Sequence, residues 1–233
     1  MINPIFTCSP SVDDQTLSST WLPTDEELRR IKEFQEIERR GDAYQQYLRF
    51  GSGEEPSIVL DNFLFLGNRV HGSNLNLLER LQIKHIINAG ETDISEKLPH
   101  DRFDIIYITM DDDIRTNIKQ YFDRTNELLH NYHMKNERCL VHCAAGVSRS
   151  ATIVLAYLMK YHHNTLNDAF HYLLEKRPQI YPNDGFMLQL LRYENELIKS
   201  REIVSTEEAS KVNNPIETIQ EFEKKQENQA NNS

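Results

Sequence analysis

The sequence predicts an α/β fold in which helices flank a central, twisted and mostly parallel sheet. Two observations lead to this prediction. Short apolar runs rich in β-branched residues, suited to buried strands, alternate with longer segments whose apolar residues recur at helical spacing. The 233 residues include 39% hydrophobic residues, enough for one core, and show no internal repeat. Because such sheets collect functional residues at the carboxyl ends of their strands, we expect a site there.

The individual elements follow from periodicity and turn residues. An Asp61-Asn62 turn separates two short strands, and the remaining segments alternate between strand and helix patterns. Strands are expected at residues 58–60, 63–66, 85–89, 105–110 and 139–141. Helices are expected from about residue 73 and over 118–132, 150–159, 165–176 and 184–199.

Three regions divide the chain in this prediction: an N-terminal extension over 1–55, a main folded domain over 56–201 and a tail over 202–233. The lead-in to residue 23 lacks periodicity, and Tyr44, Tyr47 and Phe50 are expected near the pocket mouth or in packing contacts. The tail is rich in Glu, Gln, Asn and Lys, so we expect it to be acidic and disordered.

The N-terminal extension contains one amphipathic helix. Thr24 and Glu27 have the spacing of a capping box, and apolar residues follow at helical spacing. These apolar residues are Leu28, Ile31, Phe34 and Ile37. Two interpretations remain open, packing of this helix on the domain and binding of a partner by its apolar face.

Composition excludes several function classes. The formal net charge is −10 and the mean hydropathy is −0.62, which argue against a nucleic-acid surface and against electrostatic docking on anionic lipid. The cysteines at 8, 139 and 143 form no disulfide framework, and no segment has the length and hydropathy of a membrane span. We therefore expect neither nucleic acid nor membrane as a partner and a cytoplasmic or nuclear location.

The most informative segment is residues 138–152, which contain His142-Cys143-x5-Arg149-Ser150. A strand-like run ends at His142, a loop of small residues follows, and a buried helix begins near Ser150. A loop that closes onto a helix N-terminus turns backbone N–H groups inward and forms an oxyanion site. Such a site favours the thiolate of Cys143, while Arg149 can hold two oxygens of one phosphate.

The loop between Cys143 and Arg149 has the residue types that a cradle of this kind needs. Its glycine permits backbone angles that other residues resist, and its small side chains keep the rim low. The alternative, an unreactive buried cysteine on a strand, does not explain the neighbouring His, Arg and Ser. We expect the phosphate to contact the loop residues Ala144, Ala145, Gly146, Val147 and Ser148.

This segment resembles the signature of the cysteine-dependent protein tyrosine phosphatases, within them the dual-specificity subgroup of small, atypical type. Three further segments resemble the same family: Phe63-Leu-Phe-Leu-Gly67, Leu81-Gln-Ile-Lys-His-Ile-Ile-Asn88 and Pro182-Asn-Asp-Gly-Phe186. The resemblance covers roughly residues 56–200. It implies the cysteine phosphatase fold, with a strand, a phosphate loop and a helix at the active site.

The resemblance also implies a general-acid aspartate on a loop before a helix. Three aspartates occupy this place, Asp111, Asp112 and Asp113. In the family the acid stands six residues before the aliphatic residue that opens the helix, and counting back from Ile118 selects Asp112. Asp111 is the second candidate.

The remaining roles follow from the same resemblance. Cys143 would be the nucleophile, Arg149 would hold the phosphate, and Ser150 would hydrogen-bond the sulfur. His142 would orient the loop backbone, and Asn183 would support the loop, while a plain turn role after Pro182 is compatible with this. No His, Cys or Asp set has metal-ligand spacing, so we expect neither a metal nor a cofactor.

Substrate class is argued from the variable loop positions. They carry no lysine, which disfavours a highly charged inositol headgroup and favours a phosphoprotein bearing phospho-Tyr or phospho-Ser/Thr. A protein kinase is one expected partner, and the oligomeric state stays open. Lys176 and Arg177 are expected either to contact a second phosphate or to act as helix-end cations. The alternatives are a phosphoprotein-binding or scaffold module with weak or no catalysis, and a phosphatase of a non-protein phosphate.

Overall fold

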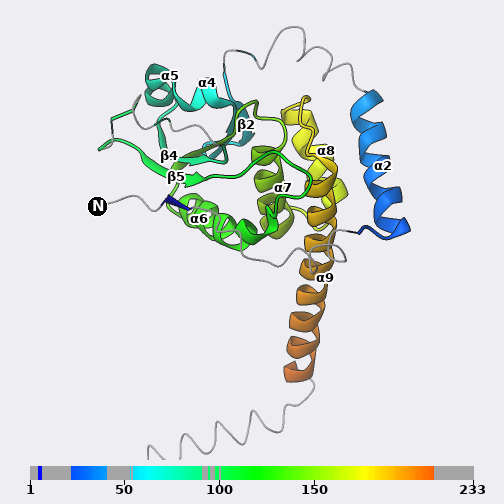
Figure 1. The fold of residues 1–233 in the computed structure, drawn as a ribbon. Helices are drawn as coiled ribbons and strands as arrows, with labels where there is room; N and C mark the ends of the chain where they lie inside the picture. Colours follow the sequence, from blue (N-terminus) through cyan, green and yellow to red (C-terminus); the bar gives the residue numbers. More distant parts are fainter. Residues whose placement is uncertain are drawn as a thin grey trace, which may run out of the picture. The chain divides into compact units, whose positions relative to one another are not determined.

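The strands form one sheet, almost entirely parallel, in the computed structural model, which describes residues 5–6, 22–40, 53, 55–90, 94, 98–99 and 101–212. Their order is β1-β5-β4-β6-β3-β2, and only the β2–β3 pair is antiparallel (Figure 1). The strands are β1 (Ile5–Phe6), β2 (Ser57–Leu60), β3 (Leu64–Gly67), β4 (Ile83–Asn88), β5 (Asp104–Ile108) and β6 (Arg138–His142). The predicted fold class is confirmed.

Helices cover both faces of the sheet. The short helices α4 (Arg69–Gly72) and α5 (Leu75–Arg80) lie on one face, and α6 (Phe122–Met134) and α7 (Arg149–Tyr161) lie on the other (Figure 1). A 3-10 turn at Lys119–Tyr121 precedes α6. Helix α8 covers Leu166–Lys176 and α9 covers Asp184–Val212.

The core explains why the central strands are apolar on both sides. Ile86 of β4 and Leu140 of β6 belong to a cluster that packs under α5, while their neighbours Ile87 and Val141 are also fully buried. A strand buried on both faces reads as a continuous apolar run, which is typical of parallel sheets. Helix α7 is buried along residues 149–159, which matches the predicted buried helix.

The carboxyl ends of the central strands meet where the sequence predicted the site. Strand β6 ends at His142, directly before Cys143, and β4 ends beside it at Asn88. The amide of Ala89 donates to the His142 carbonyl at 2.7 Å, so the two strand ends stay paired up to the loop. The register of the sheet therefore fixes where the loop after β6 begins.

Helix α2 (Asp25–Arg40) packs against the rest of the compact unit Met1–Glu194. Its capping box is present, since the Thr24 amide donates to Glu27 at 2.8 Å and the Glu27 amide to Thr24 Oγ1 at 3.2 Å. Phe34 is 4% exposed, and its ring centroid lies 4.9 Å from that of Phe170 in α8. Of the two open interpretations, packing on the domain is the one that the structure shows.

A buried carboxylate adds a second attachment for α2. Glu194 accepts from the Leu166 amide at the start of α8 at 2.6 Å and pairs with Arg30 at 2.7 Å. The side chain of Glu194 is only 5% exposed, so both partners compensate a carboxylate withdrawn from water.

Helix α9 continues beyond its predicted end at Lys199. It reaches Val212, so residues 202–212 are helical where we expected disorder. This stretch contains good helix formers such as Glu, Ala and Lys and no Gly or Pro before Pro215, which explains the extension. Residues Asn195–Ser233 form a unit of their own, and residues 213–233 lie outside the described part.

The N-terminal lead-in differs from its prediction at one point. Ile5–Phe6 pairs with β5 as a two-residue strand, although the sequence shows no strand pattern there. The expectations for Cys8, Tyr44, Tyr47 and Phe50 fall outside the described residues. Among the described helices, none has both the length and the apolar content to cross a bilayer.

Substitution of Phe34 by Ala tests whether α2 belongs to the folded unit. We expect the free energy of unfolding to fall by about 3 kcal/mol, because a buried aromatic side chain is removed from its contact with Phe170. Leu28 is 39% exposed in the same helix, and Leu28→Ala should cost less than about 1 kcal/mol. Equal effects in urea unfolding of the two variants would contradict the packing of α2.

Candidate active site

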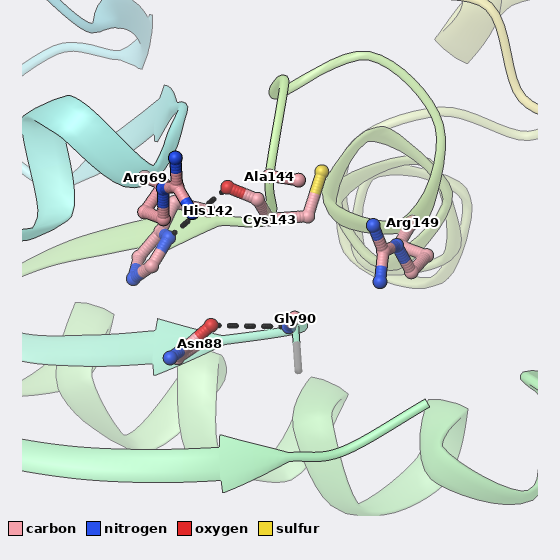
Figure 2. Close-up of a pocket in the computed structure, with 7 residues that line it drawn as sticks. All are labelled: Arg69, Asn88, Gly90, His142, Cys143, Ala144 and Arg149. Atoms are coloured by element: carbon pink, nitrogen blue, oxygen red, sulfur yellow. Dashed lines mark hydrogen bonds between the residues drawn. The ribbon is translucent and has the colours of Figure 1, made fainter. Parts of the chain in front are cut away.

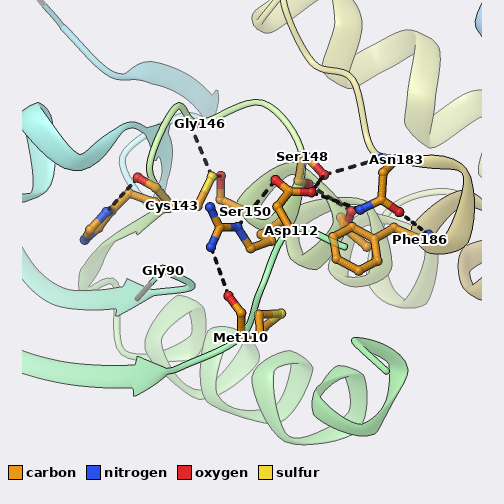
Figure 3. Close-up of polar contacts among 12 residues, drawn as sticks. Gly90, Met110, Asp112, Cys143, Gly146, Ser148, Ser150, Asn183 and Phe186 are labelled. Atoms are coloured by element: carbon orange, nitrogen blue, oxygen red, sulfur yellow. Dashed lines mark hydrogen bonds and ion pairs between the residues drawn. The ribbon is translucent and has the colours of Figure 1, made fainter. Parts of the chain in front are cut away.

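Cys143 lies at the base of the loop that follows β6. Its side chain is buried, and the residue is 2% exposed. The sulfur accepts hydrogen bonds from the Gly146 amide and from the Ser150 hydroxyl, both at 3.2 Å (Figure 3). Two donors directed at one sulfur stabilise negative charge that develops on it.

Cys139 is a different kind of cysteine. It is fully buried in β6, and this burial raises the pKa of its thiol well above the ordinary value. A thiol in such surroundings stays protonated and unreactive. Of the two cysteines in the described part of the chain, Cys143 alone has donors directed at its sulfur from the loop.

The loop from Cys143 to Ser148 has all its carbonyl groups engaged by other parts of the protein. These bonds come from β6, α4, α7, α8 and the segment before α9. The Cys143 carbonyl is bonded to His142 Nδ1, and the Ala144 carbonyl accepts from the Arg69 amide. The carbonyls of Ala145 and Gly146 accept from Nη2 and Nε of Arg177. The Val147 carbonyl accepts from the Tyr181 amide, and the Ser148 carbonyl accepts from the N and Oγ1 of Thr152. Each peptide unit carries its donor opposite its acceptor, so carbonyls held outward leave the amides facing the cysteine.

The amides complete an anion site. Within the described residues, the N–H groups of Ala144, Ala145 and Val147 donate to no protein acceptor. Helix α7 begins at Arg149, and its N-terminus adds partial positive charge at the same place. Consecutive inward amides at a helix N-terminus form a concavity that binds phosphate.

Gly146 is required by the shape of the loop. Its φ is +71°, in the left-handed region, and a Cβ at this position would lie 2.3 Å from the carbonyl oxygen of Gly67. Any other residue would strain the backbone and push the loop away from β3.

Arg177 holds the loop from behind. It is fully buried, its Nε donates to the Gly146 carbonyl at 2.6 Å, and its Nη1 donates to Ser57 Oγ at 3.3 Å. The expectation that Arg177 contacts a second phosphate is wrong, because its guanidinium is enclosed and committed to the loop carbonyls. Lys176 makes no hydrogen bond to the loop within the described residues, and its Nζ lies 5.5 Å from the centre of the Tyr172 ring.

Arg149 lines the same cavity as the cysteine. Its residue exposure is 5%, and its Nη1 donates to the Met110 carbonyl at 2.9 Å, which holds the guanidinium beside the segment that follows β5. Its Nε lies 3.4 Å from Asp112 Oδ2. A planar guanidinium held in this way can present two N–H groups to one phosphate.

Asp112 is the member of the aspartate triplet that contacts the loop. Its Oδ1 accepts from Ser148 Oγ at 2.7 Å and from Asn183 Nδ2 at 2.9 Å. Asp113 instead pairs with Arg115, and Asp111 is exposed. Asp112 is thus the aspartate of the three that lies beside Ser148 and Arg149, and its side chain is about one-third exposed (34%).

Asn183 connects three parts of the site. Its Oδ1 accepts from the Phe186 amide at 3.0 Å in the first turn of α9, its amide nitrogen reaches Asp112, and its backbone N–H donates to Ser148 Oγ at 3.3 Å. One residue thus makes both the turn contact after Pro182 and the contacts beside the loop (Figure 3).

His142 is buried beside the cysteine and contacts the loop backbone. Its Nδ1 lies 3.3 Å from the Cys143 carbonyl, and its ring fills the space beside Gly72 of α4. Burial lowers the pKa of His142 to about 4, so the ring is neutral near pH 7. A ring with so low a pKa is a weak proton acceptor, and the contact that it makes is with the loop backbone.

The cavity at Cys143 has a volume of about 70 Å³. It is lined by Arg69, Asn88, Gly90, His142, Cys143, Ala144 and Arg149 (Figure 2). Sequence reasoning missed Arg69, Asn88 and Gly90. Asn88 and Gly90 follow the apolar run of β4, and Arg69 follows that of β3, so their position at strand carboxyl ends was the available signal.

The described residues contain no group of three or more His, Cys, Asp or Glu side chains that could hold a metal ion. The site is thus built from amides, two guanidinium groups, a thiol and a carboxylate.

Comparison with known proteins identifies the family. Residues 64–196 match the family model described as the dual specificity phosphatase catalytic domain. Human dual specificity protein phosphatase 21 is 34% identical over 176 residues, covering 74% of this chain and 88% of that protein. The chain belongs to the dual specificity phosphatase family.

Three further comparisons concern one solved structure and two longer relatives. The crystal structure of a human tyrosine phosphatase-like serine/threonine/tyrosine-interacting protein superposes with a TM-score of 0.57 at 32% identity, covering 63% of this chain and 99% of that one. A Dictyostelium discoideum protein named as a probable rhodanese domain-containing dual specificity protein phosphatase is 39% identical over 143 residues, covering 61% of this chain. The chain spans only 29% of that protein and 22% of the Caenorhabditis elegans tyrosine-protein phosphatase vhp-1.

Substitution of Arg177 by Met tests whether the outward carbonyls shape the anion site. We expect a loss of about tenfold or more in affinity for orthovanadate, because the Ala145 and Gly146 carbonyls lose their charged donor. Lys176→Ala removes a neighbouring cation that makes no hydrogen bond to the loop within the described residues and should bind orthovanadate like the wild type. Calorimetric titration measures both, and unchanged binding by Arg177→Met would refute the role given to Arg177.

Proposed function

We propose that residues 56–201 are the catalytic domain of a phosphoprotein phosphatase that hydrolyses phospho-Tyr and phospho-Ser/Thr monoesters through a cysteinyl-phosphate intermediate. One observation supports this above all others. A buried thiol with two donors on its sulfur stands at the floor of an amide-lined loop that also carries Arg149. This is the arrangement that a nucleophile attacking a bound phosphate needs.

In the first step the Cys143 thiolate attacks phosphorus in line with the leaving oxygen. The loop amides and Arg149 hold the three equatorial oxygens and stabilise the charge spread over them. The bond between phosphorus and the leaving oxygen breaks as the sulfur–phosphorus bond forms. Asp112, in its acid form, gives a proton to the leaving oxygen, so the dephosphorylated hydroxyl departs neutral.

In the second step a water molecule replaces the departed hydroxyl. The Asp112 carboxylate accepts a proton from this water as its oxygen attacks phosphorus. The sulfur–phosphorus bond breaks, inorganic phosphate leaves, and the thiolate returns. The Ser150 hydroxyl, 3.2 Å from the sulfur, stabilises the thiolate as a leaving group.

Three polar contacts support the role of Asp112 as a positioned acid. Ser148 and Asn183 hold one of its oxygens, and Arg149 lies beside the other. His142 and Asn183 are proposed to orient the loop and the acid without touching the phosphate. The loop residues Ala144 to Ser148 contact the phosphate chiefly through their backbone, since their side chains are small and uncharged.

A protein substrate is favoured over a small anionic one by this loop. Its variable positions carry no lysine that would bind further phosphates of an inositol headgroup. The alternative of a binding module has a parallel in the human neighbour named tyrosine phosphatase-like, but the nucleophile, the arginine and the acid are all present here. The complete set favours catalysis.

The same chemistry favours a particular cellular compartment and a particular kind of partner. A catalytic thiolate works in a reducing compartment, which supports a cytoplasmic or nuclear location. The partner is then a phosphorylated protein, and a protein kinase with a phosphorylated Tyr or Thr is one candidate of that kind.

Phosphate release from a phosphotyrosine peptide and a phosphothreonine peptide under reducing conditions tests the proposed activity. We expect the purified protein to release phosphate from both and Cys143→Ser to release none, because the hydroxyl is a far weaker nucleophile than the thiolate. Cys139→Ser is the matched control and should retain activity. Turnover that survives in Cys143→Ser, or wild-type protein that binds both peptides without release, would contradict the proposal.

A comparison of Asp112→Asn with Asp111→Asn tests the general acid. The first should lower kcat on the phosphothreonine peptide by about 10²- to 10⁴-fold, since the alkoxide leaving group then lacks its proton. The loss should be smaller on an aryl phosphate whose phenol is already acidic. Asp111→Asn should behave like the wild type, and the reverse pattern would assign the acid to Asp111.

A further inference from the structure

Helix α2 precedes residues 64–196 that match the family model, yet it is attached to the part of α9 that belongs to the same compact unit. Arg192 of α9 donates to Glu27 at 2.9 Å, and Arg30 pairs with Glu194 at 2.7 Å. The most exposed of these four side chains is 29% exposed, so solvent and salt screen the two pairs less than surface pairs. The two helices are therefore joined in a fixed register.

A third contact joins α2 to the very start of α9. Gln35 Nε2 donates to Asp184 Oδ1 at 2.6 Å. Asp184 is the first residue of α9 and directly follows Asn183, whose Nδ2 donates to Asp112 at 2.9 Å (Figure 3). A hydrogen bond to a carboxylate is stronger than one between neutral groups, so Gln35 holds the first turn of α9. Two hydrogen bonds and one peptide bond thus lead from Gln35 to Asp112.

The first turns of α9 also hold the segment that carries Asp112. Gln189 Nε2 donates to the Thr116 carbonyl at 2.9 Å. Gly185 approaches the same segment so closely that a Cβ there would lie 1.8 Å from the carbonyl oxygen of Ile114. A shift at the start of α9 is therefore transmitted to the residues around Asp112, because such close packing leaves no room to absorb it.

Resting on the proposed function, we propose that Gln35 is a positioning residue for the general acid. Its bond to Asp184 fixes the start of α9, so that Asn183 holds the Asp112 carboxyl where it can reach the leaving oxygen. Proton transfer requires hydrogen-bond distance between the acid and this oxygen, so a small displacement of the carboxyl lowers the rate. Helix α2 then contributes to protonation of the leaving group and not to stability alone.

Gln35→Glu tests this role with a side chain of nearly the same shape. The new carboxylate has no proton to donate to Asp184 and repels its charge. We expect kcat on the phosphothreonine peptide to fall by about tenfold, because its alkoxide leaving group needs a proton. On an aryl phosphate with an acidic phenol, kcat should change by less than about twofold, since that leaving group departs without a proton.

Three further variants make the result specific. Adding Asp184→Asn to Gln35→Glu supplies an amide donor for the new carboxylate, and this double variant should regain most of the lost kcat. Lys32→Gln lowers the charge of α2 by the same one unit at an exposed position and should behave like the wild type. In an Asp112→Asn background, Gln35→Glu should cause no further loss, because Gln35 acts through that carboxylate.

The outcomes separate this role from a purely structural one. An unchanged kcat on the phosphothreonine peptide in Gln35→Glu, or an equal loss on both substrates, would overturn the positioning role and leave the phosphatase activity intact. A loss that persists in the double variant, that appears in Lys32→Gln, or that adds to the loss in Asp112→Asn would also overturn it. Release of phosphate from neither substrate by the wild type would instead remove the proposed function, and the role of Gln35 with it.

Discussion

The rest of the site depends on the outward orientation of the carbonyl groups in one short loop. A peptide unit cannot point its N–H toward a bound anion unless its carbonyl finds a donor on the other side. In this protein the donors are the buried guanidinium of Arg177, a side chain of α7 and backbone amides such as those of Arg69 and Tyr181. Segments far apart in the sequence thus cooperate to hold six residues, which makes the anion site a product of the whole fold.

The same arrangement couples the proposed nucleophile, Cys143, to the proposed acid, Asp112. Ser148 closes the loop and donates to Asp112, and Asn183 donates to the same oxygen of that carboxylate while it caps the first turn of α9. The segment after β5, the phosphate loop and the start of α9 therefore share one hydrogen-bond network. Because the loop that carries Cys143 and the Asp112 carboxylate are joined by this network, the protein framework sets the distance between thiol and carboxylate.

Much of this could be predicted from sequence because the information is local. The parallel sheet follows from apolar strands buried on both faces, and the spacing from Cys143 to Arg149 indicates a phosphate loop at a strand end. Contacts between segments that are far apart in the sequence could not be predicted in this way, because no short stretch of residues indicates them. Arg177 seemed a free helix-end cation because nothing in the sequence shows that it is fully buried under the loop. Helix propensity beyond Lys199 was underestimated for a chain that has no breaker before Pro215.

Direct detection of the covalent intermediate tests the central claim most closely. The protein would be mixed with a phosphotyrosine peptide, quenched with acid on the millisecond scale, and digested for mass spectrometry of the phosphorylated residue. The account predicts a phosphate adduct on Cys143 that forms before free phosphate appears and decays as it accumulates. Free phosphate released without any adduct on Cys143, or an adduct on a different residue, would contradict it.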